Sequence, residues 1–175
     1  MKLAMVCFVA WVLMAGCQNR RDQIVHLYSS DNKAFVQQRS VNEFALQLSY
    51  LPASLLMKSA VEDTGFYYFK LNVVCPVTNT TMSSNKTELF YGIDSLFATA
   101  EALPLANPVL VEPVITGSQR HFEYLLVFDK KDFKSGEPLK VVFFDRLFTN
   151  TKQVFVFDRI KIDEIETLQS PAHEA

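Results

Sequence analysis

The chain has 175 residues, of which 49% are hydrophobic and 21% are charged, and its formal net charge is −2. The nearly balanced charge argues against a nucleic-acid partner, which normally requires a basic face, and the high apolar fraction argues against a disordered chain. Three cysteines are too few for a disulfide-stapled scaffold, and the length suits one domain of ordinary size.

The N-terminal segment has the pattern of a secretory signal peptide. Lys2 precedes an apolar run from Leu3 to Ala15, and Gly16, Cys17 and a polar stretch follow. The run is shorter than the roughly 20 apolar residues that a membrane-spanning helix needs, but it fits the hydrophobic region of a signal peptide. The sequence therefore predicts that residues 1–16 are removed.

The end of this segment is more specific. Leu13-Met14-Ala15-Gly16-Cys17 resembles the lipobox of bacterial lipoprotein precursors, in which an aliphatic residue and two small residues precede an invariant cysteine. The segment departs from that pattern at Met14, where the family prefers Leu. The resemblance implies that the thiol of Cys17 receives a diacylglycerol and that Cys17 becomes the first residue after cleavage. Its new amino group is then acylated, for example with palmitate.

The same resemblance implies a location. Two or more acyl chains give a stable membrane anchor. In proteobacterial lipoproteins an Asp after the cysteine retains the protein in the inner membrane, and this chain has Gln18 there. We therefore expect a protein anchored by lipid in the outer membrane of the cell envelope and facing the periplasm. The alternative is an ordinary signal peptide followed by an incidental cysteine.

Residues 17–40 are polar and weakly patterned, which predicts a lipidated N-terminus followed by a tether that contains at most one short ordered piece. Beyond it, alternating apolar residues predict a β domain over residues 41–168. A first strand runs to Tyr50, and Pro52 opens a short helical turn that extends to about Ala60. A second strand starts at Gly65, with a core face made of Tyr67, Phe69, Leu71, Val73 and Cys75.

The spacing of apolar residues after Asp94 predicts a helix from Asp94 to Leu103. Pro108 and Pro113 bracket an extended segment, which we place at a sheet edge because proline donates no ladder hydrogen bond. Three further alternating runs, joined by short polar turns, predict antiparallel hairpins. These runs are Phe122–Phe128, Val141–Phe144 and Val154–Ile162.

Together these elements predict a mainly β fold, an antiparallel β-sandwich of immunoglobulin-like or Greek-key type with one or two short helices. A β-barrel is the alternative. Residues 169–175 are expected to form a disordered tail. Phe66 and Tyr68 lie opposite the core face of the second strand. They form either an exposed interaction patch or, as we favour, a surface covered by the helix after Asp94.

An aromatic-Asp-basic pattern repeats around Asp129, Asp145 and Asp158. A carboxylate cluster could bind Ca²⁺. However, hairpin strands alternate in direction, which separates Asp129 from Asp145 by about 20 Å. We therefore favour local capping or cross-strand pairing for each of these side chains.

The sequence predicts no catalytic, cofactor-binding or metal-ligating residue. Cys75 is on the predicted core face, where a thiol is buried and inert. His26, His121 and His173 are far apart and match no zinc motif, and the nucleotide-binding and hydrolase motifs are absent from the sequence.

We therefore expect a non-enzymatic, lipid-anchored binding or assembly factor that contacts an envelope protein through a sheet edge or loop face. The alternatives are a lipoprotein that binds a glycan or a peptide and, less favoured, a hydrolase. The sequence identifies no small-molecule ligand.

Overall fold

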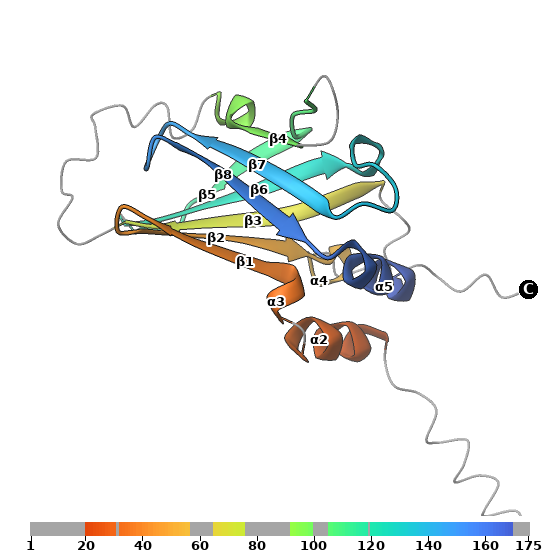
Figure 1. Cartoon of the computed structure of the whole chain (residues 1–175). Coiled ribbons are helices and arrows are strands. Elements are labelled where there is room, and N and C mark those ends of the chain that lie inside the picture. Colours follow the sequence, from red (N-terminus) through yellow and green to blue (C-terminus); the bar gives the residue numbers. More distant parts are fainter. Residues whose placement is uncertain are drawn as a thin grey trace, which may run out of the picture.

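The computed structural model describes residues 20–30, 32–56, 65–75, 92–99, 105–118 and 120–169. Two antiparallel sheets pack face to face (Figure 1), which confirms the predicted mainly β sandwich. The described strands do not close into a barrel. The larger sheet has the strand order β1 (Val36–Val41), β2 (Phe44–Leu51), β3 (Phe66–Val74), β6 (His121–Asp129) and β5 (Leu110–Val114).

The smaller sheet contains β4 (Phe97–Thr99), β7 (Leu139–Asp145) and β8 (Thr151–Phe157), in that order. All neighbouring strands are antiparallel. The orders β2-β3-β6-β5 and β4-β7-β8 correspond to the A-B-E-D and C-F-G sheets of a constant-type immunoglobulin domain, and β1 is an additional strand. The segment with Pro113 is the edge strand β5, as its prolines predict.

One predicted connection and one predicted helix are wrong. β6 and β7 do not form a hairpin, because the chain passes through the 3-10 helix η3 (Lys130–Asp132) and crosses to the other sheet. The predicted helix from Asp94 to Leu103 is instead the 3-10 helix η2 (Ile93–Leu96) followed by β4, and residues 100–104 are outside the described part. All three residues of β4 are buried, so its apolar pattern lacks the alternation that identifies a strand.

The structure differs from the tether predicted over residues 17–40, because regular structure is already present at Arg20. Helix α2 (Arg20–Ser30) and the short helix α3 (Asn32–Phe35) precede β1. Ile24 and Phe35 are only 1% and 0% exposed, because both side chains enter the hydrophobic core. The sequence pattern missed this role because these two apolar residues are separated by a polar stretch.

Two helices follow strands of opposite sheets. Helix α4 (Ala53–Leu56) agrees with the helical turn predicted after Pro52, whose later residues are not described. Helix α5 (Arg159–Gln169) corrects the prediction that Ile160 and Ile162 continue a strand. The Asp158 carboxylate accepts a hydrogen bond from the amide of Ile160 (3.0 Å), which caps the first turn of α5.

The helices α2, α4 and α5 lie at one end of the sandwich, which we call the helical end (Figure 1). The opposite end, which we call the hairpin end, carries the β1–β2 turn and the β7–β8 turn. β3 and β6 run between the two ends, because Phe66 pairs with Asp129 at the helical end and Val74 pairs with His121 at the hairpin end.

Aromatic rings join the two sheets in the core. Phe69 of β3 is 0% exposed, and its ring centroid lies 5.1 Å from that of Phe157 in the other sheet. Tyr50 and Phe128, on the strands beside β3, also contact the Phe69 ring, at 5.9 and 6.1 Å. The predicted core face of the β3 segment is confirmed, since all five of its residues are buried.

This packing predicts a large loss of stability for Phe69→Ala. The substitution leaves a cavity between the sheets, which we expect to lower the free energy of unfolding by about 3–5 kcal/mol. Phe66→Ala is the matched control, because Phe66 is on the same strand but only partly buried on its other face. Urea denaturation of both variants measures the difference. Equal losses would contradict the central role of Phe69.

Candidate functional site

The predicted lipid-attachment residue, Cys17, lies outside the described residues, as does His173. Arg20, the third residue after Cys17, begins α2. Within the described part, no helix is long and apolar enough to cross a membrane.

The three aspartates of the repeated motif have separate, local roles. Asp129 accepts a hydrogen bond from the Lys131 amide (3.0 Å) and forms an ion pair with the Lys131 ammonium group (2.6 Å). The Lys131 side chain is the largest of the influences that lower the pKa of Asp129. Asp129 and Asp158 each cap a helix at the helical end, whereas Asp145 lies at the hairpin end. The structure therefore does not bring the three carboxylates together.

Asp145 organises the β7–β8 turn. Its side chain is buried and accepts hydrogen bonds from the amides of Leu147 (3.0 Å), Phe148 (2.9 Å) and Thr149 (2.9 Å). The Thr149 hydroxyl donates a fourth, at 2.6 Å. These donors supply the partners that a buried carboxylate needs. Over the described ranges, no group of three or more His, Cys, Asp or Glu side chains could hold a metal ion.

Cys75 is buried at the hairpin end, as predicted, with 6% of its surface exposed. Burial raises the pKa of its thiol, and the nearby Asp145 carboxylate raises it further. Burial also raises the pKa of Tyr124, again with contributions from Cys75 and Asp145. A buried thiol that keeps its proton is a poor nucleophile. Cys75 therefore has the environment of a core residue.

His121 lines two grooves of the larger sheet. Its ring lies 3.5 Å from the Glu123 carboxylate, and its side chain is 39% exposed. The other described histidine, His26, is exposed on α2. Two described grooves lie at His121, and Glu123 is the only carboxylate residue in their linings. These two side chains form an acid–base pair, and the hydroxyl residues Thr116 and Ser118 line the same groove. Neither hydroxyl is hydrogen-bonded to the His121 ring, as an activated nucleophile would be.

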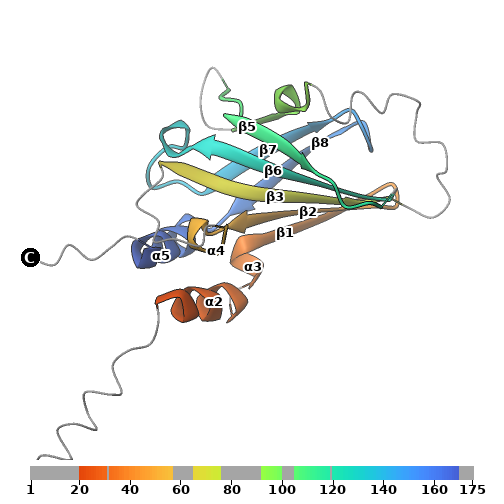
Figure 2. The ribbon, with the colours of Figure 1, turned by 180° about the vertical axis from the view of Figure 1, so that it is seen from behind.

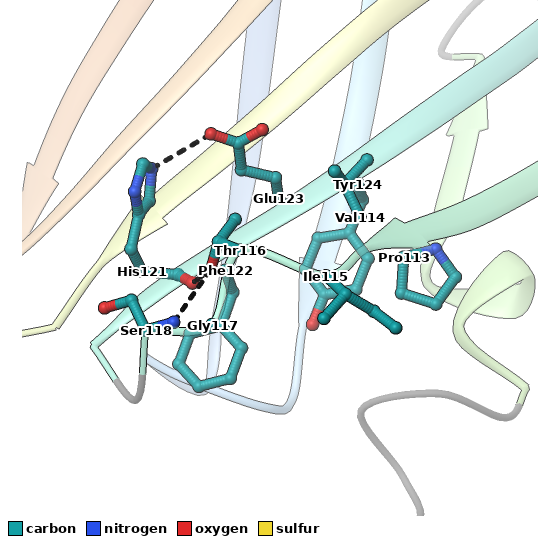
Figure 3. A pocket seen from close by; sticks show the side chains of 10 residues that line it. All are labelled: Pro113, Val114, Ile115, Thr116, Gly117, Ser118, His121, Phe122, Glu123 and Tyr124. Atoms are coloured by element: carbon teal, nitrogen blue, oxygen red, sulfur yellow. Dashed lines mark hydrogen bonds and ion pairs between the residues drawn. The ribbon is translucent and has the colours of Figure 1, made fainter.

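One groove at His121 follows the edge of the larger sheet and has a volume of about 190 Å³. Figure 3 shows its lining, which comes from β5, the loop after it and the start of β6. The Thr116 hydroxyl donates a hydrogen bond to the carbonyl of His121 (2.8 Å), so this loop is tied to β6. Pro113, Val114 and Ile115 make one side of the groove apolar.

The surface around this groove exposes much apolar area. Of the ten large apolar side chains that the described part exposes, five lie within residues 105–115. Ile115 is the most exposed, at 89%. We call these residues the β5 apolar patch, which consists of Leu105, Val109, Leu110, Val114 and Ile115. A concentration of exposed apolar side chains on one edge marks an interaction surface.

The outer face of the larger sheet extends this patch. Phe66 and Tyr68 are half-buried there, on the central strand β3. The helix expected to cover this face is replaced by η2 and β4, and β4 belongs to the other sheet. Tyr68 pairs with Leu51 and Val127, and Val127 pairs with Leu110 of the β5 apolar patch.

A second groove of about 340 Å³ crosses the larger sheet at the hairpin end. Most of its exposed lining is apolar, and we call it the polar groove for the amide side chains that it also contains. Amide side chains from three strands line it: Gln38, Gln47 and Asn72. The Gln38 amide donates a hydrogen bond to the Gln47 side-chain oxygen (3.0 Å), whereas the buried Oδ1 of Asn72 has no hydrogen-bond partner. Such a lining offers both donors and acceptors to a polar ligand.

The sequence pattern predicted neither the β5 apolar patch nor the polar groove. A signal for the patch exists in Leu110-Val111-Glu112-Pro113-Val114-Ile115, where apolar residues occupy both faces of a strand marked as an edge by proline. The groove has no comparable signal, because its amides come from strands that are distant in sequence. Comparisons with family models, curated proteins and solved structures find no match to this chain.

The hydrogen bonds of Asp145 predict a structural role that can be measured. Asp145→Ala leaves four donors without their acceptor, and we expect the free energy of unfolding to fall by about 3 kcal/mol. Asp158→Ala is the matched control, because it removes an exposed helix cap worth about 1 kcal/mol. Thermal or urea unfolding compares the two variants. A smaller loss for Asp145→Ala than for Asp158→Ala would contradict the assigned role.

Proposed function

We propose that this protein is a non-catalytic lipoprotein of the bacterial cell envelope that binds another envelope protein through the β5 apolar patch. It is anchored through lipid on Cys17 in the outer membrane and faces the periplasm, as the lipobox resemblance and Gln18 suggest. The observation that carries the binding function is the concentration of exposed apolar side chains on an edge strand.

The character of β5 favours contact through side chains. Pro113 has no N–H group to donate to an added strand, and the exposed charge of Glu112 protects a sheet edge against strand addition. Leu110 and Val114 are 48% and 43% exposed on the same face of β5. A partner that covers these side chains gains the free energy of apolar burial without extending the sheet.

The polar groove favours a second candidate function, the binding of a glycan or a peptide. Its volume falls within the range of small-molecule sites, and amide side chains hydrogen-bond readily to hydroxyl or peptide groups. A hydrolase is less favoured. Thr116 and Ser118 line the same groove as the His121–Glu123 pair, but neither hydroxyl is hydrogen-bonded to the His121 ring, as an activated nucleophile would be.

The binding function is tested by placing a charge in the patch. Val114→Lys puts an ammonium group where a partner would bury apolar surface, and we expect partner recovery from detergent-solubilised envelope to fall about tenfold or more. Val156→Lys is the matched control, because Val156 is 40% exposed on β8 of the other sheet. Quantitative mass spectrometry of cross-linked complexes measures recovery.

The same experiment separates the two candidates. Unchanged recovery in Val114→Lys would contradict binding through the patch. If no protein partner is recovered, and a glycan array gives a signal that Gln47→Ala abolishes and Val114→Lys preserves, the polar groove is the binding site instead.

The anchor is tested by metabolic labelling with radioactive palmitate. We expect the wild-type protein to carry label and to fractionate with membranes, and Cys17→Ala to lose both properties, because the lipidated thiol is missing. Cys75→Ala is the control, since that thiol is buried in the domain. Label that persists in Cys17→Ala would refute the anchor.

A further inference from the structure

The described part of the domain begins very close to the proposed lipidation residue. Two residues separate Cys17 from Arg20, the first residue of α2. Because a fully extended chain spans at most about 3.6 Å per residue, the two Cα atoms are at most about 11 Å apart. A domain on so short a connection cannot stand off the bilayer by the width of a folded domain.

We propose that the helical end rests directly on the surface of the membrane that holds the lipid, an inference that depends on the proposed lipidation of Cys17. The bilayer is thus the occupant of the surface formed by α2, α4 and α5. In Figures 1 and 2, α2 lies beside α5 at this end of the molecule.

Helix α2 is held to the domain, so its position limits the orientation of the whole sandwich. Ile24 is buried in the core, and the Tyr28 hydroxyl donates a hydrogen bond to the carbonyl of Tyr50 (2.9 Å). The Tyr28 ring also stacks on Phe35, with the centroids 5.2 Å apart. Moving α2 away from the domain would break each of these contacts.

Helix α5 is attached equally firmly beside α2. The buried Tyr50 hydroxyl donates a hydrogen bond to the Glu166 carboxylate, whose other oxygen lies 2.7 Å from the Lys130 ammonium group. Burial raises the pKa of Tyr50 well above its usual value, with a further contribution from Glu166, so the hydroxyl keeps its proton. The amide of Ser54 in α4 donates a hydrogen bond to Gln169 of α5 (2.8 Å). The three helices therefore form one unit.

The surface of this unit suits the interface of a bilayer. Each helix exposes one large apolar side chain: Val25 on α2 (44%), Leu56 on α4 (42%) and Ile160 on α5 (77%). Asp163 and Glu164 are exposed on α5 and form ion pairs with basic residues of the same helix, at 3.6 and 3.4 Å. The helix therefore has no excess of basic charge, and attraction to anionic lipids is not the main force. Covalent acyl chains supply the anchoring free energy, and the short connection holds the helices against the headgroups.

This orientation leaves the β5 apolar patch accessible from the aqueous compartment. The chain passes from α2 and α3 into β1, and β1 and β5 are the opposite edges of the five-stranded sheet. Figure 2 shows β5 on the side of the sandwich away from α2. The lipid-facing surface and the proposed partner surface are therefore distinct.

The inference is tested with single-cysteine labels on the full lipidated chain. Cys75→Ala removes the remaining thiol of the domain, and the lipid occupies Cys17. A fluorophore is then placed by Val25→Cys at the helical end or, as the matched control, by Ile115→Cys in the β5 apolar patch. Vesicles of phosphatidylethanolamine and phosphatidylglycerol carry a spin-labelled headgroup as quencher.

We expect the Val25→Cys label to lose fluorescence when spin-labelled lipid is present and the Ile115→Cys label to keep it. A flexible insertion after Gln18 should relieve the quenching, because the short connection imposes the contact. Equal quenching at both positions, or quenching that survives the insertion, would overturn the proposed orientation.

Mass spectrometry of the same preparation separates this inference from the proposed function. An unacylated Cys17 would refute the anchor and the orientation together. An acylated Cys17 with an unquenched Val25→Cys label would refute the orientation alone.

Discussion

The contact between Phe69 and Phe157 joins the two sheets, and the rest of the structure depends on it. Immunoglobulin domains with the same strand order commonly join the strands equivalent to β3 and β7 with a disulfide. Here Cys75 lies just past the end of β3, and β7 contains no cysteine. Aromatic packing replaces the covalent link, with a second pair, Phe97 and Phe143, stacked at 4.6 Å within the smaller sheet.

Each end of the sandwich is stabilised by the hydrogen bonds of a buried or partly buried carboxylate. The two carboxylates bind different kinds of partner. At the hairpin end, Asp145 satisfies the amides of a turn within its own chain segment. At the helical end, Glu166 joins elements that are distant in sequence, because it contacts both Tyr50 and Lys130. The first stabilises a local conformation, whereas the second fixes the position of α5 on the sheet.

The sequence predicted those features that depend on local periodicity. The core face of β3 alternates strictly, and proline at residue 113 identified an edge strand. Alternation does not encode which sheet a strand joins, so β6 and β7 were wrongly paired. Ile160 and Ile162 matched a period of two, but the Asp158 cap and the burial of Ile162 and Ile165 belong to a helix. The polar groove was unpredictable, because strand pairing alone brings Gln47 and Asn72 together.

The helix α2 changes what a lipid anchor would mean for this protein. A long tether would let the domain sample every orientation, and its binding surface would have no fixed direction. Burial of Ile24 instead packs the segment after Arg20 against the core. Core packing of α2 and a lipid on Cys17 would then together fix the orientation of the domain on the membrane. The membrane would define one end of the sandwich, and strand order would carry β5 to the far edge, where a partner in the periplasm can reach it.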